Sequence, residues 1–280
     1  MRIAISNIAW DVGDDEAVAE LLSRYGIDAI DTAPGKYFDN LPQTTDRDIE
    51  RVSTWWADHG ISITGMQALL FGTTGLNLFG DPTSRDQMLS HLDAVCRIGS
   101  GLGAPRLAFG SPKNRDRSGL TSAQTDTLAL EFFQRLGDIA GSHGVTICLE
   151  PNPPCYGANF MINSAETAAV VNQIAHPSIR MQLDTGAMTI NQESPEDVVF
   201  TYAPIIGHIH ASEPGLVPLG EGGCDHSAIG QVISTKLPDQ IVSIEMLATN
   251  GKTNLAAIER ALKVAIRYYR NDSTTEKVYA

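Results

Sequence analysis

The sequence predicts an α/β fold, a single-domain (β/α)8 TIM barrel, and three observations support this. Short apolar runs alternate with amphipathic helical stretches along the whole chain, eight times in all. The 280 residues are close to the roughly 250 that such a barrel requires. The last four apolar runs end in Glu150, Asp184, His210 and Glu245, which are separated by 34, 26 and 35 residues. Each separation is about one strand plus one helix, so the pattern favours a closed parallel barrel over an open sheet.

The predicted strands are apolar runs, as expected for strands that are buried on both faces. In chain order they cover Arg2–Trp10, Ile27–Thr32, Ile61–Leu70, Pro105–Gly110, Val145–Glu150, Ile179–Asp184, Ile206–His210 and Gln240–Met246.

The predicted helices lie between these strands and carry start and stop signals. They cover Asp15–Tyr25, Asp46–His59, Arg85–Ile98, Ala123–His143, Ala165–Ile174, Pro195–Thr201, Ser227–Ser234 and Leu255–Tyr269. Gly26, Gly60 and Gly144 follow three of them and suit the left-handed conformation that ends a helix. Ser164 precedes one helix, and Ser194 with Pro195 opens another. We therefore expect one barrel domain over residues 1–270 and a frayed C-terminal tail over 271–280.

Composition narrows the class of protein. The net charge of −13 opposes binding to the nucleic-acid backbone, so we expect no nucleic-acid partner. No apolar run approaches the length of a membrane span, and the N-terminus suits a first strand better than a signal peptide. The four cysteines form no CxxC pair, and Cys148 suits a reduced, buried thiol. We expect a cytoplasmic protein.

The four strand-end residues form a candidate metal site, because the C-terminal ends of the strands build the active face of such a barrel. Alone, each has a structural explanation: a carboxylate can cap a helix, and a histidine can hold a hydrogen bond. Together, Glu150, Asp184, His210 and Glu245 lie at one height on four adjacent units. Three carboxylates and one imidazole suit Mn2+ first, with Mg2+, Co2+ or Zn2+ as alternatives, and they exclude a thiolate-rich structural zinc site.

The motifs LEPNP, QLDTG, GHIHASE and SIEM contain these residues. With them the chain resembles the xylose isomerase-like barrel superfamily of sugar and sugar phosphate isomerases and epimerases, and its pattern is closest to the D-tagatose 3-epimerase branch. The resemblance implies that Glu150, Asp184, His210 and Glu245 bind the metal and that Glu150 and Glu245 are the catalytic acid and base. It also implies proton transfer through a metal-bound enediolate of a small-molecule carbohydrate. Relatives of this type commonly pair, so a homodimer is expected.

Two positions depart from the branch. Ketose 3-epimerases carry a substrate-binding His three residues after the metal Asp, where this chain has Ala187, and an Arg six residues after the metal His, where it has Leu216. A free ketohexose is therefore a less suitable substrate, because lost hydrogen-bonding partners change which hydroxyls are recognised.

Other polar residues near the strand ends are candidates for substrate binding, each with a structural alternative. His208 and Glu213 flank the metal His, and we weigh a buried supporting role for the first and loop packing for the second. Strand-end amides can also serve only the backbone. The candidates are Gln67, Asn152, His208, Glu213, His226 and Lys36.

A charged loop follows the fourth predicted strand. Its residues Lys113, Arg115 and Arg117, together with Lys36, form either an anion clamp or a solvated charged surface.

Three other functions were weighed. Endonuclease IV shares the superfamily, but its extra metal histidines have no counterpart, because His59, His91, His143 and His176 fall on or just after helices. A dehydratase would begin with the same α-proton abstraction and then lose water. A non-catalytic sugar-binding barrel would make the two glutamates dispensable. The sequence leaves open which sugar is bound, whether it is phosphorylated, and which metal is native.

Overall fold

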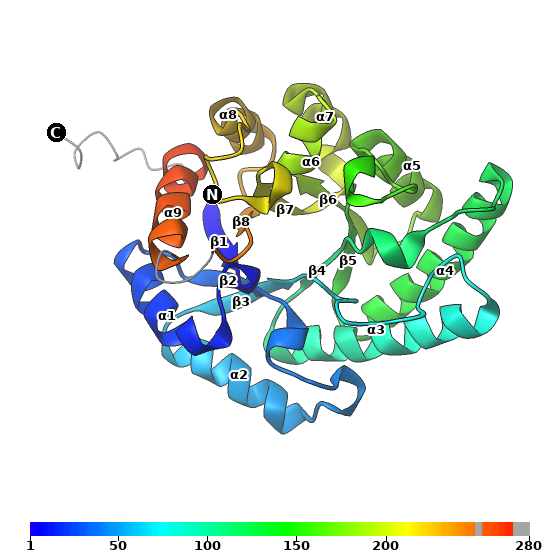
Figure 1. Cartoon of the computed structure of the whole chain (residues 1–280), viewed down its shortest axis with the longest axis horizontal. Helices are drawn as coiled ribbons and strands as arrows, with labels where there is room; N and C mark the ends of the chain where they lie inside the picture. The colour runs from blue at the N-terminus through cyan, green and yellow to red at the C-terminus, as the bar shows by residue number, and fades with distance from the viewer. Residues whose placement is uncertain (250–253, 271–280) are drawn as a thin grey trace.

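The computed structural model describes residues 1–249 and 254–270. Eight parallel strands follow one another in chain order around a closed barrel, and β1 pairs with β8 to complete it (Figure 1). The strands are β1 Arg2–Ser6, β2 Ala29–Thr32, β3 Ser62–Met66, β4 Arg106–Phe109, β5 Thr146–Leu149, β6 Ile179–Asp184, β7 Ile206–Ser212 and β8 Ile241–Glu245. The predicted (β/α)8 fold is confirmed, while the predicted tail, 271–280, lies outside the described residues.

The helices surround the barrel (Figure 1). They are α1 Asp15–Arg24, α2 Asp46–Asp58, α3 Pro82–Leu102, α4 Ser122–Ser142, α5 Ser164–Ile174, α6 Thr185–Ile190, α7 Pro195–Tyr202, α8 His226–Lys236 and α9 Asn254–Tyr269. None of these helices is long and apolar enough to cross a membrane.

Helix α6 was not predicted. It begins directly after β6, where the Asp184 carboxylate accepts a hydrogen bond from the Ala187 backbone N–H at 2.6 Å. Asp184 therefore both ends β6 and caps α6, and no loop residues separate the strand from the helix. One strand-to-strand connection consequently holds two helices, α6 and α7.

Most of the predicted helix signals occur as expected. Gly26, Gly60 and Gly144 have φ of 59°, 72° and 70°, the left-handed conformation that glycine adopts easily. The Ser194 hydroxyl caps α7, which starts at Pro195. The prediction for α5 was wrong by one residue, because the cap is Asn163 and Ser164 belongs to the helix.

Several strands are shorter than their apolar runs. The predicted strand Ile61–Leu70 ends at Met66, and Ala68 has a φ of 55°, which no strand residue adopts. The run continues because Leu69 and Leu70 are buried under the next loop. Because the residues after the strand are also apolar and buried, the sequence pattern does not show where the strand ends.

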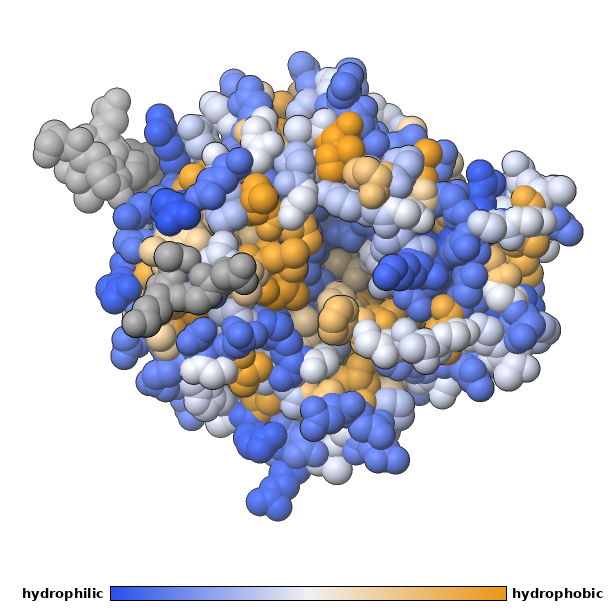
Figure 2. Space-filling model, viewed as in Figure 1, coloured by the Kyte–Doolittle hydropathy of each residue, from blue (hydrophilic) through white to orange (hydrophobic). Residues whose placement is uncertain are grey.

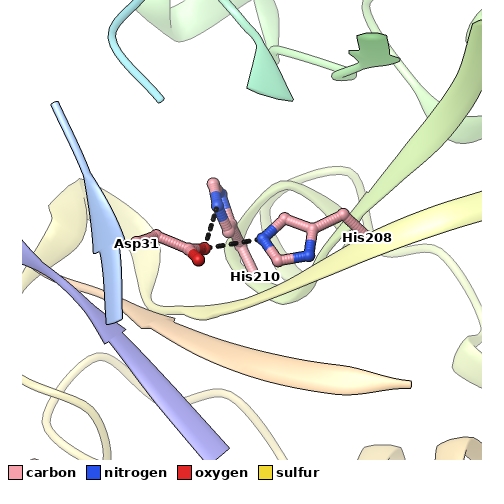
Figure 3. Close-up of side chains that lie close together, drawn as sticks. All are labelled: Asp31, His208 and His210. Atoms are coloured by element: carbon pink, nitrogen blue, oxygen red, sulfur yellow. Dashed lines mark hydrogen bonds and ion pairs between the residues drawn. The ribbon is translucent and has the colours of Figure 1, made fainter. Parts of the chain in front are cut away.

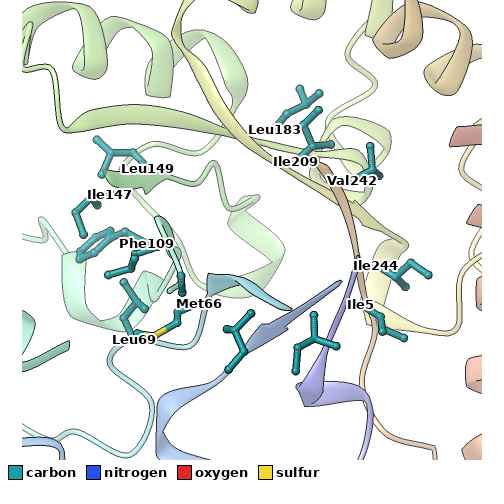
Figure 4. Packing of buried hydrophobic residues seen from close by; sticks show 14 of the residues in the cluster. Ile5, Met66, Leu69, Phe109, Ile147, Leu149, Leu183, Ile209, Val242 and Ile244 are labelled. Atoms are coloured by element: carbon teal, nitrogen blue, oxygen red, sulfur yellow. The ribbon is translucent and has the colours of Figure 1, made fainter. Parts of the chain in front are cut away.

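Alternation along the strands separates the core from the site. Leu183, Ile209 and Val242 occupy paired positions on β6, β7 and β8 and lie beside one another in the apolar core (Figure 4). His208 and His210 flank Ile209 in sequence, so their side chains point to the opposite side of the sheet, into the barrel. Cys148 is fully buried, and burial raises the pKa of its thiol to about 12.

Candidate active site

Four side chains meet where the last four strands end. Glu150 follows β5, Asp184 ends β6, His210 lies in β7 and Glu245 ends β8. One ligand atom from each lies within 4.8 Å of the others. The register explains the convergence, because Asp184 pairs with His210 and Ser212 pairs with Glu245 across neighbouring strands. The structure thus brings the predicted ligand set together.

One nitrogen of the imidazole lies close to both glutamates. His210 Nδ1 is 3.2 Å from Glu150 Oε1 and 3.4 Å from Glu245 Oε2. Burial alone lowers the pKa of His210, but the carboxylates of Glu245 and Glu150 outweigh it and raise that pKa well above its ordinary value. The ring therefore compensates part of the negative charge around it.

The third carboxylate receives less compensation. Asp184 Oδ1 accepts the Ala187 N–H, and Oδ2 accepts the Ser212 hydroxyl at 2.8 Å. Burial, followed by the charges of Glu245 and Glu150, raises the pKa of Asp184 to about 8. Two buried carboxylates and the half-buried Glu245, with one imidazole, leave negative charge that a divalent cation would balance. This donor set of oxygens and one nitrogen fits such an ion.

Two amides hold the glutamates in matching ways. Gln67 Nε2 donates to Glu245 Oε1 at 2.8 Å, and Asn152 Nδ2 donates to Glu150 Oε2 at 3.3 Å. Each glutamate thus has one oxygen toward His210 and the other on an amide. Both amides also line the cavity above, so a substrate contact from either stays a prediction.

Arg115 occupies a place that the sequence did not suggest. Its side chain is fully buried; Nη1 donates to the Glu150 carbonyl at 2.8 Å, and Nη2 donates to Asn152 Oδ1. Both sequence interpretations of this residue, an anion clamp and a solvated charge, are therefore wrong. Lys113 is exposed, as a solvated loop predicts, whereas Arg117 Nε donates to the Asn159 carbonyl at 2.7 Å.

A buried carboxylate lies below the imidazole, and the sequence analysis missed it. Asp31 on β2 is fully buried, with Oδ2 at 2.6 Å from His208 Nε2 and 4.0 Å from His210 Nε2 (Figure 3). The Thr64 hydroxyl donates to its Oδ1 at 3.1 Å. Gly65 leaves room for it, since a Cβ there would lie 2.6 Å from Asp31 Oδ1. The available signal in the sequence was Asp31 itself, an acidic residue inside the predicted buried strand Ile27–Thr32.

This contact revises the predicted role of His208. Its ring faces Asp31 inside the barrel and does not belong to the cavity wall. The supporting role weighed for His208 fits this position, and direct contact with substrate does not.

Glu213 and His226 hold the loop after β7. Glu213 accepts the N–H groups of Gly220 and Cys224 at 2.7 and 2.9 Å and lies 3.0 Å from His226 Nε2. His226 Nδ1 lies 2.6 Å from the Tyr269 hydroxyl on α9. Burial raises the pKa of Glu213, but His226 and the amides outweigh it and lower that pKa to about 2. Substrate binding by His226 is therefore not supported, because its ring is buried away from the cavity wall.

A cavity of about 600 Å³ opens above the four residues, and Figure 2 shows the hollow at the centre of this face. Lys36 is part of its wall, but its Nζ donates to the Trp10 carbonyl and lies 4.0 Å from Asp11 Oδ1. Ala187 and Leu216, the two departures from the epimerase pattern, also line the cavity. The substituted positions therefore face the space that a substrate would enter.

Comparison with known proteins agrees with this architecture. The model of the family described as "Xylose isomerase-like TIM barrel" matches residues 19–271. A candidate hydroxypyruvate isomerase from Xenopus laevis is 24% identical over 230 residues, which cover 75% of this chain and 78% of that protein. A D-psicose 3-epimerase from Agrobacterium fabrum is 28% identical over 102 residues, covering 36% of this chain and 35% of that protein.

Solved structures share the fold. A D-psicose 3-epimerase crystallised with D-fructose has a TM-score of 0.80 at 19% identity, covering 96% of this chain and 99% of that one. A candidate 3-DHS dehydratase from Bacillus anthracis has a TM-score of 0.73 at 16% identity, covering 97% and 100%.

The buried arginine leads to a stability prediction. We expect Arg115→Met to lower the free energy of unfolding by roughly 2 kcal/mol or more, because the Glu150 carbonyl and Asn152 Oδ1 lose their donor in a buried place. Urea unfolding measures the change. Lys113→Met is the matched control in the same loop and should change stability by less than about 0.5 kcal/mol. Equal effects of the two substitutions would contradict the assigned role of Arg115.

The raised pKa of Asp184 leads to a prediction about pH. Its pKa is about 8 in the folded, metal-free protein, above the ordinary 3.8, so folding takes up a proton between these values. The contribution of Asp184 to stability is therefore fully present at low pH and is lost as pH rises toward 8. We expect the metal-free protein to lose stability over this range relative to Asp184→Asn. Parallel pH profiles in urea unfolding would contradict the assignment.

Proposed function

Because the chain belongs to the xylose isomerase-like TIM barrel family, we propose that it is a divalent-metal-dependent isomerase or epimerase of a sugar or sugar derivative. The observation that carries the proposal is the matched placement of Glu150 and Glu245, each with one oxygen close to His210 Nδ1, at the floor of a cavity of about 600 Å³. Such symmetry suits a reaction that removes a proton with one carboxylate and returns it with the other.

The ligands in this proposal are Glu150, Asp184, His210 and Glu245, with Mn2+ as the preferred ion and Mg2+, Co2+ or Zn2+ as alternatives. When bound, the ion would polarise the carbonyl of the substrate and acidify the neighbouring C–H. Asp31 and His208 support His210 from below, and Arg115 fixes the backbone at Glu150. These contacts keep the ligand atoms at one point while substrate enters from above.

Proton movement falls to the two glutamates. Asn152 and Gln67 each donate to one carboxylate oxygen and hold the two carboxylates in defined orientations. One glutamate takes the proton next to the carbonyl, and the other delivers a proton to the resulting enediolate. Because each carboxylate is held in a defined orientation, the proton reaches the carbon from a fixed direction.

A dehydratase is the second candidate, because a structure described as a dehydratase shares this fold at a TM-score of 0.73. Both reactions begin with removal of the same proton. They differ in whether water leaves afterwards. Uptake of solvent deuterium into a sugar without dehydration supports the isomerase or epimerase, and loss of water supports the lyase.

The two-glutamate assignment predicts a loss of activity without a loss of fold. We expect Glu150→Gln and Glu245→Gln each to lower turnover by at least roughly a hundredfold, because an amide cannot accept the proton. Deuterium exchange across a panel of keto and aldo sugars, with Mn2+ present, measures turnover, and circular dichroism checks the fold. Glu196→Gln, on the exposed start of α7, is the control. Near-native exchange in either active-site variant would overturn the assignment.

The ligand assignment predicts a loss of metal. We expect His210→Ala to weaken Mn2+ binding by at least about tenfold, because it removes the single nitrogen donor of the site. Metal content after dialysis against buffered Mn2+ gives the comparison. His143→Ala is the control, because that ring lies on the surface beside Asp93. Unchanged metal content in His210→Ala would remove His210 from the ligand set.

A further inference from the structure

The wall of the cavity becomes less polar with distance from the cavity floor. Its carboxylates and amides lie at the floor, and several polar groups higher up are already engaged by the protein. The Tyr156 hydroxyl accepts the Gly215 N–H at 2.7 Å, Lys36 donates to the Trp10 carbonyl, and Glu213 faces its own loop. These contacts use part of the hydrogen-bonding capacity of the wall, so a polar group there would gain fewer hydrogen bonds in exchange for the water it loses.

Four apolar side chains line this upper part, and we call Ile8, Phe71, Leu216 and Leu247 the apolar rim. Backbone hydrogen bonds join three of their loops: the Leu247 N–H donates to the Leu216 carbonyl at 2.9 Å, and the Ala248 N–H donates to the Ile8 carbonyl at 3.2 Å. Phe71 and Leu247 remain 85% and 52% exposed. Figure 2 shows apolar residues bordering the central hollow.

Leu216 is an unusual residue for its position. Its φ of 53° lies in the left-handed region, where glycine or asparagine is less strained than leucine. The flanking contacts hold it there, since its N–H donates to the Glu213 carbonyl and its carbonyl accepts the Leu247 N–H. An apolar side chain is thus present at the cavity wall despite an unfavourable backbone.

We propose that the apolar rim binds an apolar substituent of the substrate, so that the substrate is a sugar derivative with an aryl or alkyl group on the carbon farthest from its carbonyl. The proposal rests on the proposed function, which places the carbonyl and its neighbouring carbon at the floor. The far end of the sugar then points to the rim. The volume of about 600 Å³ lies in the range of roughly 300–1,000 Å³ for drug-sized ligands, which exceed a free monosaccharide.

Two matched probes test the proposal, 6-O-benzyl-D-fructose and 6-O-methyl-D-fructose, which share the reacting carbons and differ only at the remote end. We expect the Mn2+-loaded protein to bind the benzyl compound more tightly by roughly tenfold or more in calorimetry. Phe71→Ser and Leu247→Ser should bring the two affinities together. Phe200→Ser is the control, since Phe200 is 48% exposed on α7 and lies outside the cavity wall, and it should keep the wild-type preference.

Equal affinities of the wild-type protein for the two probes would overturn the proposal. So would a second copy covering the rim, which would appear as a dimer that Phe71→Ser converts to a monomer in light scattering while the preference for the benzyl compound stays unchanged. Failure of the proposed function has a different signature. In that case neither probe takes up solvent deuterium, although the benzyl compound still binds more tightly through Phe71 and Leu247.

Discussion

Mutual repulsion among three carboxylates, two of them buried and one half-buried, is the constraint around which the C-terminal end of this barrel is arranged. Like charges held close together repel one another, and one oxygen each of Glu150, Asp184 and Glu245 lies within 4.8 Å of the others. Hydrogen-bond donors surround them: two side-chain amides, the Ser212 hydroxyl and the Ala187 N–H. These donors do not cancel the effects of burial and of the charges of Glu245 and Glu150, which together raise the pKa of Asp184 to about 8. Such a cluster could hold a divalent cation.

Supporting contacts reach the cluster from two directions. From below, Asp31 and His208 lie against His210 inside the barrel. From the side, Arg115 binds the carbonyl of Glu150 and the amide that orients its carboxylate. In the proposed metal site, changes to the groups behind the ligands would lower metal affinity, so Asp31, His208 and Arg115 are part of that proposal although none of them need touch a substrate.

The sequence was sufficient for the fold and for the four residues that converge at the strand ends, because both repeat at the spacing of one strand and one helix. It was insufficient for the supporting residues. Asp31 lies 177 residues from its partner His208, and only closure of the barrel brings β2 opposite β7. Arg115 looked like part of a solvated loop because its burial depends on contacts from the strand that follows. Helix α6 was missed because Asp184 serves as strand end, ligand candidate and cap at once.

The two departures from the epimerase pattern have one explanation, which is the difference in polarity between the floor of the cavity and the wall above it. Ala187 and Leu216 both face the cavity, and neither disturbs the carboxylates or the imidazole below. Polar side chains at these positions would suit a polyol, whereas apolar ones make burial of unpaired hydroxyls unfavourable. Charged groups at the floor of the cavity determine what that part can bind. Apolar side chains at the rim favour substrate groups that lose little by leaving water. The two parts of the cavity can therefore change independently. The four converging residues at the floor are kept while the wall is apolar at Ala187 and Leu216, which agrees with the proposed proton transfer on a less polar substrate.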